Sequence, residues 1–218
     1  MLNKRRTLLN VYNKLYKHFG PQHWWPAKRA FEVMVGAILT QNTAWANVEK
    51  AIANLKKEKL LSPKGIENAD LKRLKLAIRP SGFYNEKAKK LKDFVGFYIK
   101  KRKKLNGSDA GEIREMLLGV KGIGPETADS IILYALKKPV FVIDAYTRRV
   151  LARHALASRE ATYDEMQNLF MQNLPKKIKM FNEYHALFVR VAKNYCRKKK
   201  PLCGKCPLNI FKYSKNMV

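Results

Sequence analysis

The feature that most constrains the fold of this chain is a glycine-rich hairpin between two amphipathic segments. Residues 117–128 read L-L-G-V-K-G-I-G-P-E-T-A. Apolar residues recur at the i, i+3, i+4, i+7 spacing of a helix before the hairpin and line one helical face after it: Ile113, Met116, Leu117 and Val120, then Ala128, Ile131, Ile132 and Ala135. The sequence therefore predicts two helices joined by a tight turn.

Residues typical of helix ends flank both segments. Ser108 is placed to cap the first helix. Gly119 and Gly122 can adopt positive φ where that helix ends. Pro125 suits the first turn of the second helix, because its missing N–H has no partner there.

The turn between the two helices is suited to binding an anion. The amides of Gly122, Ile123 and Gly124 can point outward beside the positive end of a helix, and Lys121 adds a charge. The chain carries 45 Lys and Arg against 17 Asp and Glu, a net charge of +28, so a polyanion such as DNA is the expected partner. The alternative is an ordinary helical hairpin closed by glycine.

Asp144 follows the next apolar segment, in the string V-I-D-A-Y-T-R-R. It is the only acidic residue between Ser130 and Arg159. A carboxylate among cations stays ionised at neutral pH, as a general base or a charge stabiliser requires; the flanking cations are Lys137, Lys138, Arg148, Arg149 and Arg153. The structural alternative is a helix N-cap, because a helix is expected to follow through Leu151.

The string L-x-G-V-x-G-I-G-x-x-T-A followed by Asp144 resembles the helix-hairpin-helix (HhH-GPD) DNA glycosylase superfamily, of the endonuclease III type. The resemblance implies that Asp144 is catalytic and that the hairpin, Lys121 to Gly124, binds DNA phosphates. Relatives that also cleave the strand carry a lysine two residues after the last hairpin glycine, which forms a Schiff base with the sugar. Glu126 occupies that position here, so we expect a monofunctional glycosylase in which water attacks the sugar.

A second match lies at residues 30–48, A-F-E-V-M-V-G-A-I-L-T-Q-N-T-A-W-A-N-V, which resemble the helix pair around the DNA-facing loop of endonuclease III relatives. A polar amide there fills the gap that the extruded base leaves, and Asn42 or Gln41 is the candidate. The alternative is that residues 41–43 end one helix and cap the next.

All three tryptophans, Trp24, Trp25 and Trp45, fall in the N-terminal region. Composition alone favours core packing. The motif F-G-x-Q-x-W-W-P followed by L-T-Q-N-T-A-W, however, resembles the type-III 3-methyladenine DNA glycosylases, where the aromatics would sandwich the flipped base. An N3-alkylated adenine is cationic, and indole faces attract cations by about 0.5–2 kcal/mol. The expected reaction is therefore excision of alkylated purines, 3-methyladenine in particular, from double-stranded DNA.

The three cysteines, Cys196, Cys203 and Cys206, have the spacing C-x6-C-x2-C near the C-terminus. Iron–sulfur relatives continue with a fourth cysteine, at the position of Lys212 here. Three thiolates and a lysine are a poor set of ligands for a cubane cluster, and no histidine is close enough to build a zinc site. We therefore expect no cofactor and no metal. The odd number of cysteines favours a reducing cytoplasm, with the protein at the nucleoid.

The overall pattern predicts an all-α fold with two helical lobes. Residues 31–135 would form the lobe with the hairpin, residues 1–30 and 136–218 the other, and a cleft between them would hold the pocket with Asp144 at the junction. The clearest β-type run, 140–143, is short. Helical periodicity covers six segments: 8–19, 31–39, 46–55, 87–99, 163–174 and 182–195. No apolar run of about 18 residues is present, so we expect no membrane segment. We also expect a monomer.

Two other functions remain open at this stage. A bifunctional endonuclease III-type glycosylase and lyase for oxidised pyrimidines would share the hairpin and Asp144, but Glu126 and Lys212 argue against it. A non-catalytic helix-hairpin-helix DNA-binding module would leave Asp144 and the paired tryptophans without a purpose.

Overall fold

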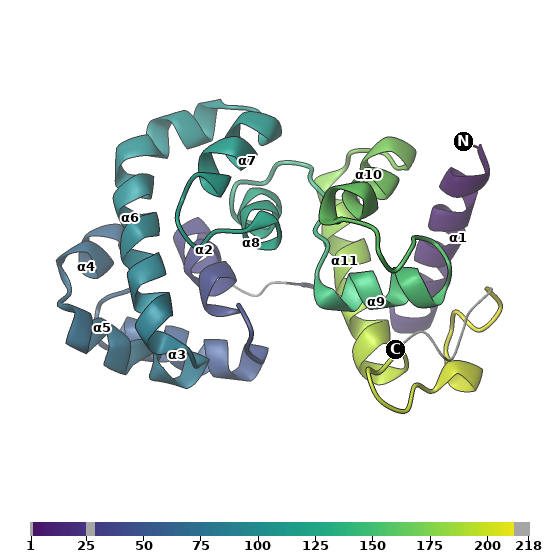
Figure 1. Cartoon of the computed structure of the whole chain (residues 1–218), viewed down its shortest axis with the longest axis horizontal. Coiled ribbons are helices and arrows are strands. Elements are labelled where there is room, and N and C mark those ends of the chain that lie inside the picture. The colour runs from purple at the N-terminus through teal and green to yellow at the C-terminus, as the bar shows by residue number, and fades with distance from the viewer. Residues whose placement is uncertain (1, 25–28, 212–218) are drawn as a thin grey trace. The chain divides into compact units, whose positions relative to one another are not determined.

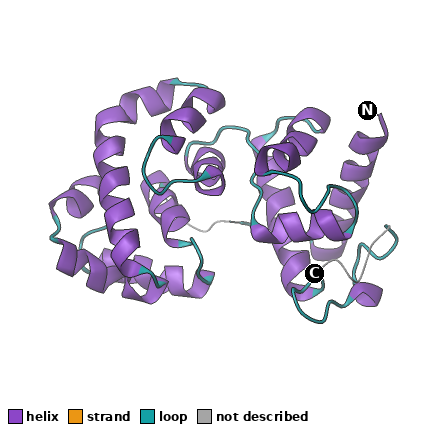
Figure 2. Ribbon diagram, in the orientation of Figure 1, coloured by secondary structure: helices purple, strands orange, loops and turns teal. Residues whose placement is uncertain are grey.

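The structure is a computed structural model that describes residues 2–24 and 29–211. Within these residues it contains helices and loops and no strand (Figure 2), which confirms the all-α prediction. The β-type run 140–143 is buried but belongs to no helix or strand, and the described residues contain no strand for it to pair with. No helix in the described ranges is both long and apolar enough to cross a membrane.

The chain divides into two compact units (Figure 1). Unit 1 comprises residues 1–24 and 139–218, and unit 2 comprises residues 25–138. Unit 1 therefore joins the first helix to the C-terminal third of the chain. Each unit has its own buried apolar residues.

In unit 1, helix α11 is the central element and packs against α1 and α9. Five buried aromatic rings fill the core around it: Phe141, Phe170, Phe181, Tyr184 and Phe188. The Tyr184 hydroxyl donates a 2.8 Å hydrogen bond to the carbonyl of Leu8, which ties α11 to α1. The helices of unit 1 are α1 (Leu2–Phe19), α9 (Ala145–Arg153), α10 (Tyr163–Asn173), α11 (Ile178–Asn194) and the 3-10 turn η3 (Cys203–Lys205).

In unit 2, helix α2 is buried from Val33 to Leu39, because every residue in that stretch is apolar or glycine. It contacts α3, α6, α8 and the π-helical turn η2. The elements of unit 2 are α2 (Ala30–Leu39), α3 (Trp45–Lys57), α4 (Pro63–Asn68), α5 (Leu71–Ile78), the 3-10 turn η1 (Arg79–Ser81), α6 (Tyr84–Gly107), α7 (Ala110–Leu118), α8 (Pro125–Ser130) and η2 (Ile131–Ala135).

The predicted helix-hairpin-helix is formed by α7 and α8. A partly buried ion pair joins the two helices, with Arg114 Nε 3.0 Å from Asp129 Oδ1. Pro125 begins α8, and Gly122 has φ +84°, as predicted. Gly119 has φ −70°, so the prediction of a positive φ there is wrong.

The prediction that Ser108 caps the first helix of the hairpin is also wrong. Asp109 is the N-cap of α7 and accepts a 2.9 Å hydrogen bond from the N–H of Glu112. Ser108 instead ends α6. A carboxylate suits the positive end of a helix at least as well as a hydroxyl, so the chain continues one residue further before α7 starts.

Candidate active site and DNA-contacting loops

Asp144 is the N-cap of α9, and both of its carboxylate oxygens are oriented by the protein. Oδ1 accepts a 2.7 Å hydrogen bond from the N–H of Thr147, which confirms the predicted cap. Oδ2 lies 3.5 Å from Nε2 of His185 on α11. The side chains of Asp144 and His185 are 13% and 6% exposed, so the pair is mostly shielded from solvent.

His185 keeps this buried carboxylate ionised. Burial by itself raises the pKa of the Asp144 carboxyl, but the charge and hydrogen bond of His185 and the N–H of Thr147 outweigh burial, so the pKa lies below the ordinary aspartate value. This role of His185 could not be predicted from the sequence, since His185 lies 41 residues after Asp144 on an ordinary amphipathic helix.

The arginines near Asp144 in the sequence make other contacts. Arg148 donates to the carbonyl of Ala161 at 2.6 Å, and Arg149 donates to the carbonyl of Cys196 at 2.7 Å. The expectation that these flanking cations keep Asp144 ionised is therefore wrong. His185 is the cationic group that lowers the pKa of Asp144. The arginines hold loops of unit 1 in place.

Trp24 also packs against His185. Its indole ring is 6.2 Å from the His185 ring, with an angle of 73° between the planes. Gln22 holds the loop that leads to it, since its N–H donates to Glu183 at 2.7 Å and its amide donates to the carbonyl of Gly20 at 2.9 Å. The buried indole N–H of Trp24 donates to no group among the described residues, which leaves a donor for a ligand.

The other two tryptophans are placed differently. Trp45 is half-buried at the start of α3 and belongs to unit 2, whereas Trp24 belongs to unit 1. Trp25 lies outside the described residues.

The hairpin leaves two of its amides available. The N–H groups of Gly122 and Gly124 make no hydrogen bond with the described residues, and both glycines are exposed, as is Lys121. Ile123 differs from the prediction, since its N–H donates to the carbonyl of Val120 at 3.0 Å and its side chain is buried. Ile123 therefore anchors the turn, and an anion would be bound by the two glycine amides beside the start of α8.

Gln41 joins the α2–α3 loop to this hairpin. Its amide nitrogen donates to the carbonyl of Gly122 at 3.1 Å and to the hydroxyl of Thr127 at 3.0 Å. Its amide oxygen accepts a 2.6 Å hydrogen bond from Nζ of Lys90 on α6. Residues 41–43 do not cap the next helix as the alternative interpretation expected, because Ala44 is the N-cap of α3.

Two exposed residues of unit 2 have strained, left-handed backbone. Asn42 is exposed with φ +53°. Phe83, between η1 and α6, has φ +46° and is 68% exposed. Left-handed backbone is costly for a residue with a side chain, and an exposed phenyl ring is costly in water. Phe83 was missed at the sequence level, where one phenylalanine among ten carried no signal.

The three C-terminal cysteines, Cys196, Cys203 and Cys206, form no disulfide. Cys196 Sγ lies 3.3 Å from Nη1 of the buried Arg153, which also donates to the carbonyl of Arg197 at 2.6 Å. Burial raises the pKa of the Cys206 thiol to about 11. No three metal-ligating side chains come together in the part of the chain that the structure describes. Lys212, at the position of the fourth cysteine, lies outside the described residues.

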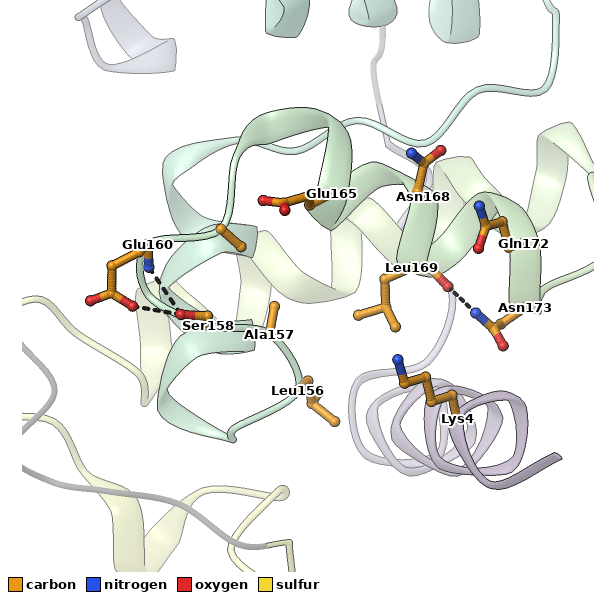
Figure 3. A pocket seen from close by; sticks show the side chains of 11 residues that line it. Lys4, Leu156, Ala157, Ser158, Glu160, Glu165, Asn168, Leu169, Gln172 and Asn173 are labelled. Atoms are coloured by element: carbon orange, nitrogen blue, oxygen red, sulfur yellow. Dashed lines mark hydrogen bonds between the residues drawn. The ribbon is translucent and has the colours of Figure 1, made fainter. Parts of the chain in front are cut away.

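A separate hollow in unit 1 is lined by α10, the 156–161 loop and Lys4 (Figure 3). Its volume is about 550 Å³, and Glu160 and Glu165 are among its lining residues. Asp144, His185 and Trp24 do not line it. Because it has no aromatic lining and carries two acids, it is poorly suited to a nucleobase in DNA.

Comparison with known proteins agrees with this geometry. The family model of the HhH-GPD superfamily base excision DNA repair proteins matches residues 35–176. A protein of Methanocaldococcus jannaschii named "Putative DNA repair glycosylase MJ1434" is 47% identical over 98% of this chain and 99% of its own length. Endonuclease III of Sulfolobus acidocaldarius is 28% identical over 84% of this chain and 82% of its own.

Two solved structures share the fold. The H. pylori 3-methyladenine DNA glycosylase (MagIII) bound to 1,N6-ethenoadenine has a TM-score of 0.74 and 31% identity, and the match covers 87% of this chain and 97% of that one. A non-covalent endonuclease III–DNA complex has a TM-score of 0.82 and 22% identity, and the match covers 95% of this chain and 94% of that one. With its hairpin and its capping aspartate, the chain belongs to the HhH-GPD superfamily of base excision repair DNA glycosylases.

Proposed function

We propose that this protein is a monofunctional DNA glycosylase that extrudes an alkylated purine, 3-methyladenine in particular, and hydrolyses its N-glycosidic bond. The observation that carries this proposal is the buried carboxylate of Asp144, kept ionised by His185, with Trp24 against the same histidine. The similarity to a 3-methyladenine glycosylase over most of both chains supports the choice of substrate.

The chemistry suits a site with one carboxylate and no strong acid. An N3-alkylated adenine already carries a positive charge, so it can leave with the electrons of the C1′–N bond without first being protonated. The ionised Asp144 would stabilise the oxocarbenium-like sugar or take a proton from the water that attacks C1′. Either role needs the anion that the site maintains.

The aromatic residues would bind the extruded base. We propose that Trp24, Trp25 and Trp45 stack on it, since a cationic purine gains from each indole face. The unused N–H of Trp24 adds a donor for a ring acceptor of the base.

The loops of unit 2 would hold the duplex open. We propose that the amides of Gly122 and Gly124 with Lys121 bind phosphates, and that Asn42 fills the gap left by the base. Gln41 is less suited to filling the gap, because its amide is already bonded to the hairpin and to Lys90. The exposed ring of Phe83 would act as an apolar wedge between base steps.

The hairpin disfavours the bifunctional reaction, in which the enzyme also cleaves the DNA strand. Glu126 is exposed in the first turn of α8, at the position where strand-cleaving relatives carry lysine, so the amine for a Schiff base is missing there. We also propose that the protein works without an iron–sulfur cluster, since Arg153 occupies the neighbourhood of Cys196.

The direct test is chromatography of the bases that the protein releases from DNA treated with a methylating agent. We expect 3-methyladenine above the enzyme-free background. Duplexes with uracil, a thymine mispair or an oxidised pyrimidine serve as competitors. Release from these in place of methylated purines would contradict the proposed substrate, and release from none would contradict the enzyme function.

A further inference from the structure

Lys87 is a buried lysine that the proposed chemistry does not use. It lies in the first turns of α6 and is 2% exposed. Its ammonium donates to the carbonyl of Leu39 at 2.8 Å and to the carbonyl of Ser81 at 2.7 Å. Leu39 is the last residue of α2 and Ser81 the last of η1, where helix carbonyls lack partners within their own helix. One ammonium therefore joins two helix ends.

Each of these two helix ends leads directly to an exposed tip. Asn42 comes three residues after Leu39, and Phe83 comes two residues after Ser81. Two or three residues of chain span at most about 11 Å, so fixing the helix ends restricts both tips closely. Both tips have positive φ, and such backbone persists only where its surroundings hold it in place.

Lys90 extends this arrangement to the hairpin. It lies three residues after Lys87 and so faces the same side of α6. Its ammonium is 2.6 Å from Oε1 of Gln41, which in turn donates to the carbonyl of Gly122. Its aliphatic stem covers the Cα of Gly122 so closely that a Cβ there would lie 2.7 Å from the Lys90 Cγ. A side chain at position 122 would therefore displace the Lys90 stem, in addition to being strained by the positive φ.

We infer that Lys87 and Lys90 are positioning residues that lock the 40–43 loop, the 82–83 turn and the 119–124 hairpin into one DNA-contacting surface. They act through Asn42, Phe83 and Gly122, without contacting the base or the sugar themselves. The inference rests on the proposed base extrusion, because the locked geometry matters only if the tips must enter the duplex while the hairpin holds the backbone.

The test compares Lys87→Met and Lys90→Met with Lys89→Met. Methionine keeps an unbranched stem but cannot donate. Lys89 is the matched control, because it lies on the same helix, is exposed and pairs only with Glu86 at 3.3 Å among the contacts described, so its substitution removes the same charge. The probes are two duplexes of one sequence, one undamaged and one with a tetrahydrofuran abasic analogue beside 2-aminopurine. The readouts are Kd for each, 2-aminopurine fluorescence, and Tm.

We expect Lys87→Met and Lys90→Met to lower the preference for the abasic duplex by about tenfold or more and to reduce the fluorescence increase. Binding to undamaged duplex should fall no more than it does in Lys89→Met. A merely structural lysine would lower Tm and leave the preference unchanged at temperatures below Tm. If Lys87→Met does not fold, the result for Lys90→Met decides whether the positioning role holds. The Lys90 ammonium is only partly buried, so its loss should be tolerated by the fold.

The failures are distinguishable. A wild-type protein that binds both duplexes equally, with no fluorescence change, contradicts the proposed base extrusion itself. A wild type that prefers the abasic duplex, together with Lys87→Met and Lys90→Met variants that keep the full preference, overturns the positioning role and leaves the proposed function intact.

Discussion

Nε2 of His185 lies 3.5 Å from Oδ2 of Asp144, while Oδ1 of the same carboxylate caps α9 through the N–H of Thr147. One oxygen is thus held by the start of a helix and the other faces the histidine of a neighbouring helix. The carboxylate keeps its charge despite burial because both contacts favour the anion.

Replacing His185 with phenylalanine should make base release sensitive to acid. Without the histidine, burial acts with little opposition and raises the pKa of Asp144, so the carboxylate becomes protonated as the pH falls. The wild-type pKa is depressed, and the wild type should therefore keep its rate from about pH 7 to about pH 5, where the variant should lose it. Single-turnover release, corrected for enzyme-free depurination, measures this.

The control for that experiment is His18→Phe. His18 is in the same unit and contacts Tyr195, away from Asp144 in the contacts described. Matching pH profiles for His185→Phe and the wild type would show that His185 does not maintain the charge of Asp144.

Lys87 predicts an unusual pH dependence of stability. Burial and the nearby charge of Lys90 lower the pKa of Lys87 to about 8, from an ordinary 10.5. Between these values the unfolded chain binds more protons than the folded one, so the contribution of Lys87 to the free energy of unfolding rises with pH across that window. Urea midpoints at about pH 7 and about pH 10 should show this rise in wild type and Lys89→Met, and a smaller one in Lys87→Met. An equal rise in all three proteins would show that Lys87 does not cause this pH dependence.

The hairpin predicts that no covalent intermediate forms with the sugar. With Glu126 in place of the lysine, borohydride should trap no protein–DNA adduct on an abasic duplex that the protein binds. A bifunctional glycosylase run in parallel shows that trapping works. An adduct with the wild type that is lost in Lys121→Ala would instead identify Lys121 as a nucleophile and contradict the monofunctional assignment.

The C-terminal loop predicts a protein without iron. Protein purified without oxygen should contain no stoichiometric iron and lack the broad absorption near 400 nm of a cubane cluster. Arg153→Met should lower Tm, because it leaves the carbonyls of Arg197 and Lys198 without their donor. About one cluster per chain in the wild type would contradict the proposed absence.

The features that depend only on residues close together in the sequence could be predicted. All six helices expected from periodicity are present, because each carries an apolar face over three turns or so. The cap at Asp144 and the proline at the start of α8 were also local signals. Helices α4 and α5 were not predicted, because six and eight residues are too short for a clear period. Their caps, Ser62 and Asp70, were the available signals.

The contacts that build the site could not be predicted in this way. Gln41 bonds to Gly122 across 81 residues, and Lys87 bonds to Leu39 across 48. His185 reaches Asp144 only because α11 packs on α9. Such pairs depend on tertiary packing, which a single sequence leaves open. The resemblance named the catalytic candidate, and the structure added the residues around it.

The most direct test of the central claim is base release from methylated DNA by the wild type and by Asp144→Asn under single-turnover conditions. Asparagine keeps the size and the capping oxygen but removes the charge. We expect the wild type to release 3-methyladenine and the variant to bind the same DNA with release slowed by about 10²–10⁴-fold. Undiminished release by Asp144→Asn, or no methylated purine released by the wild type, would contradict the account.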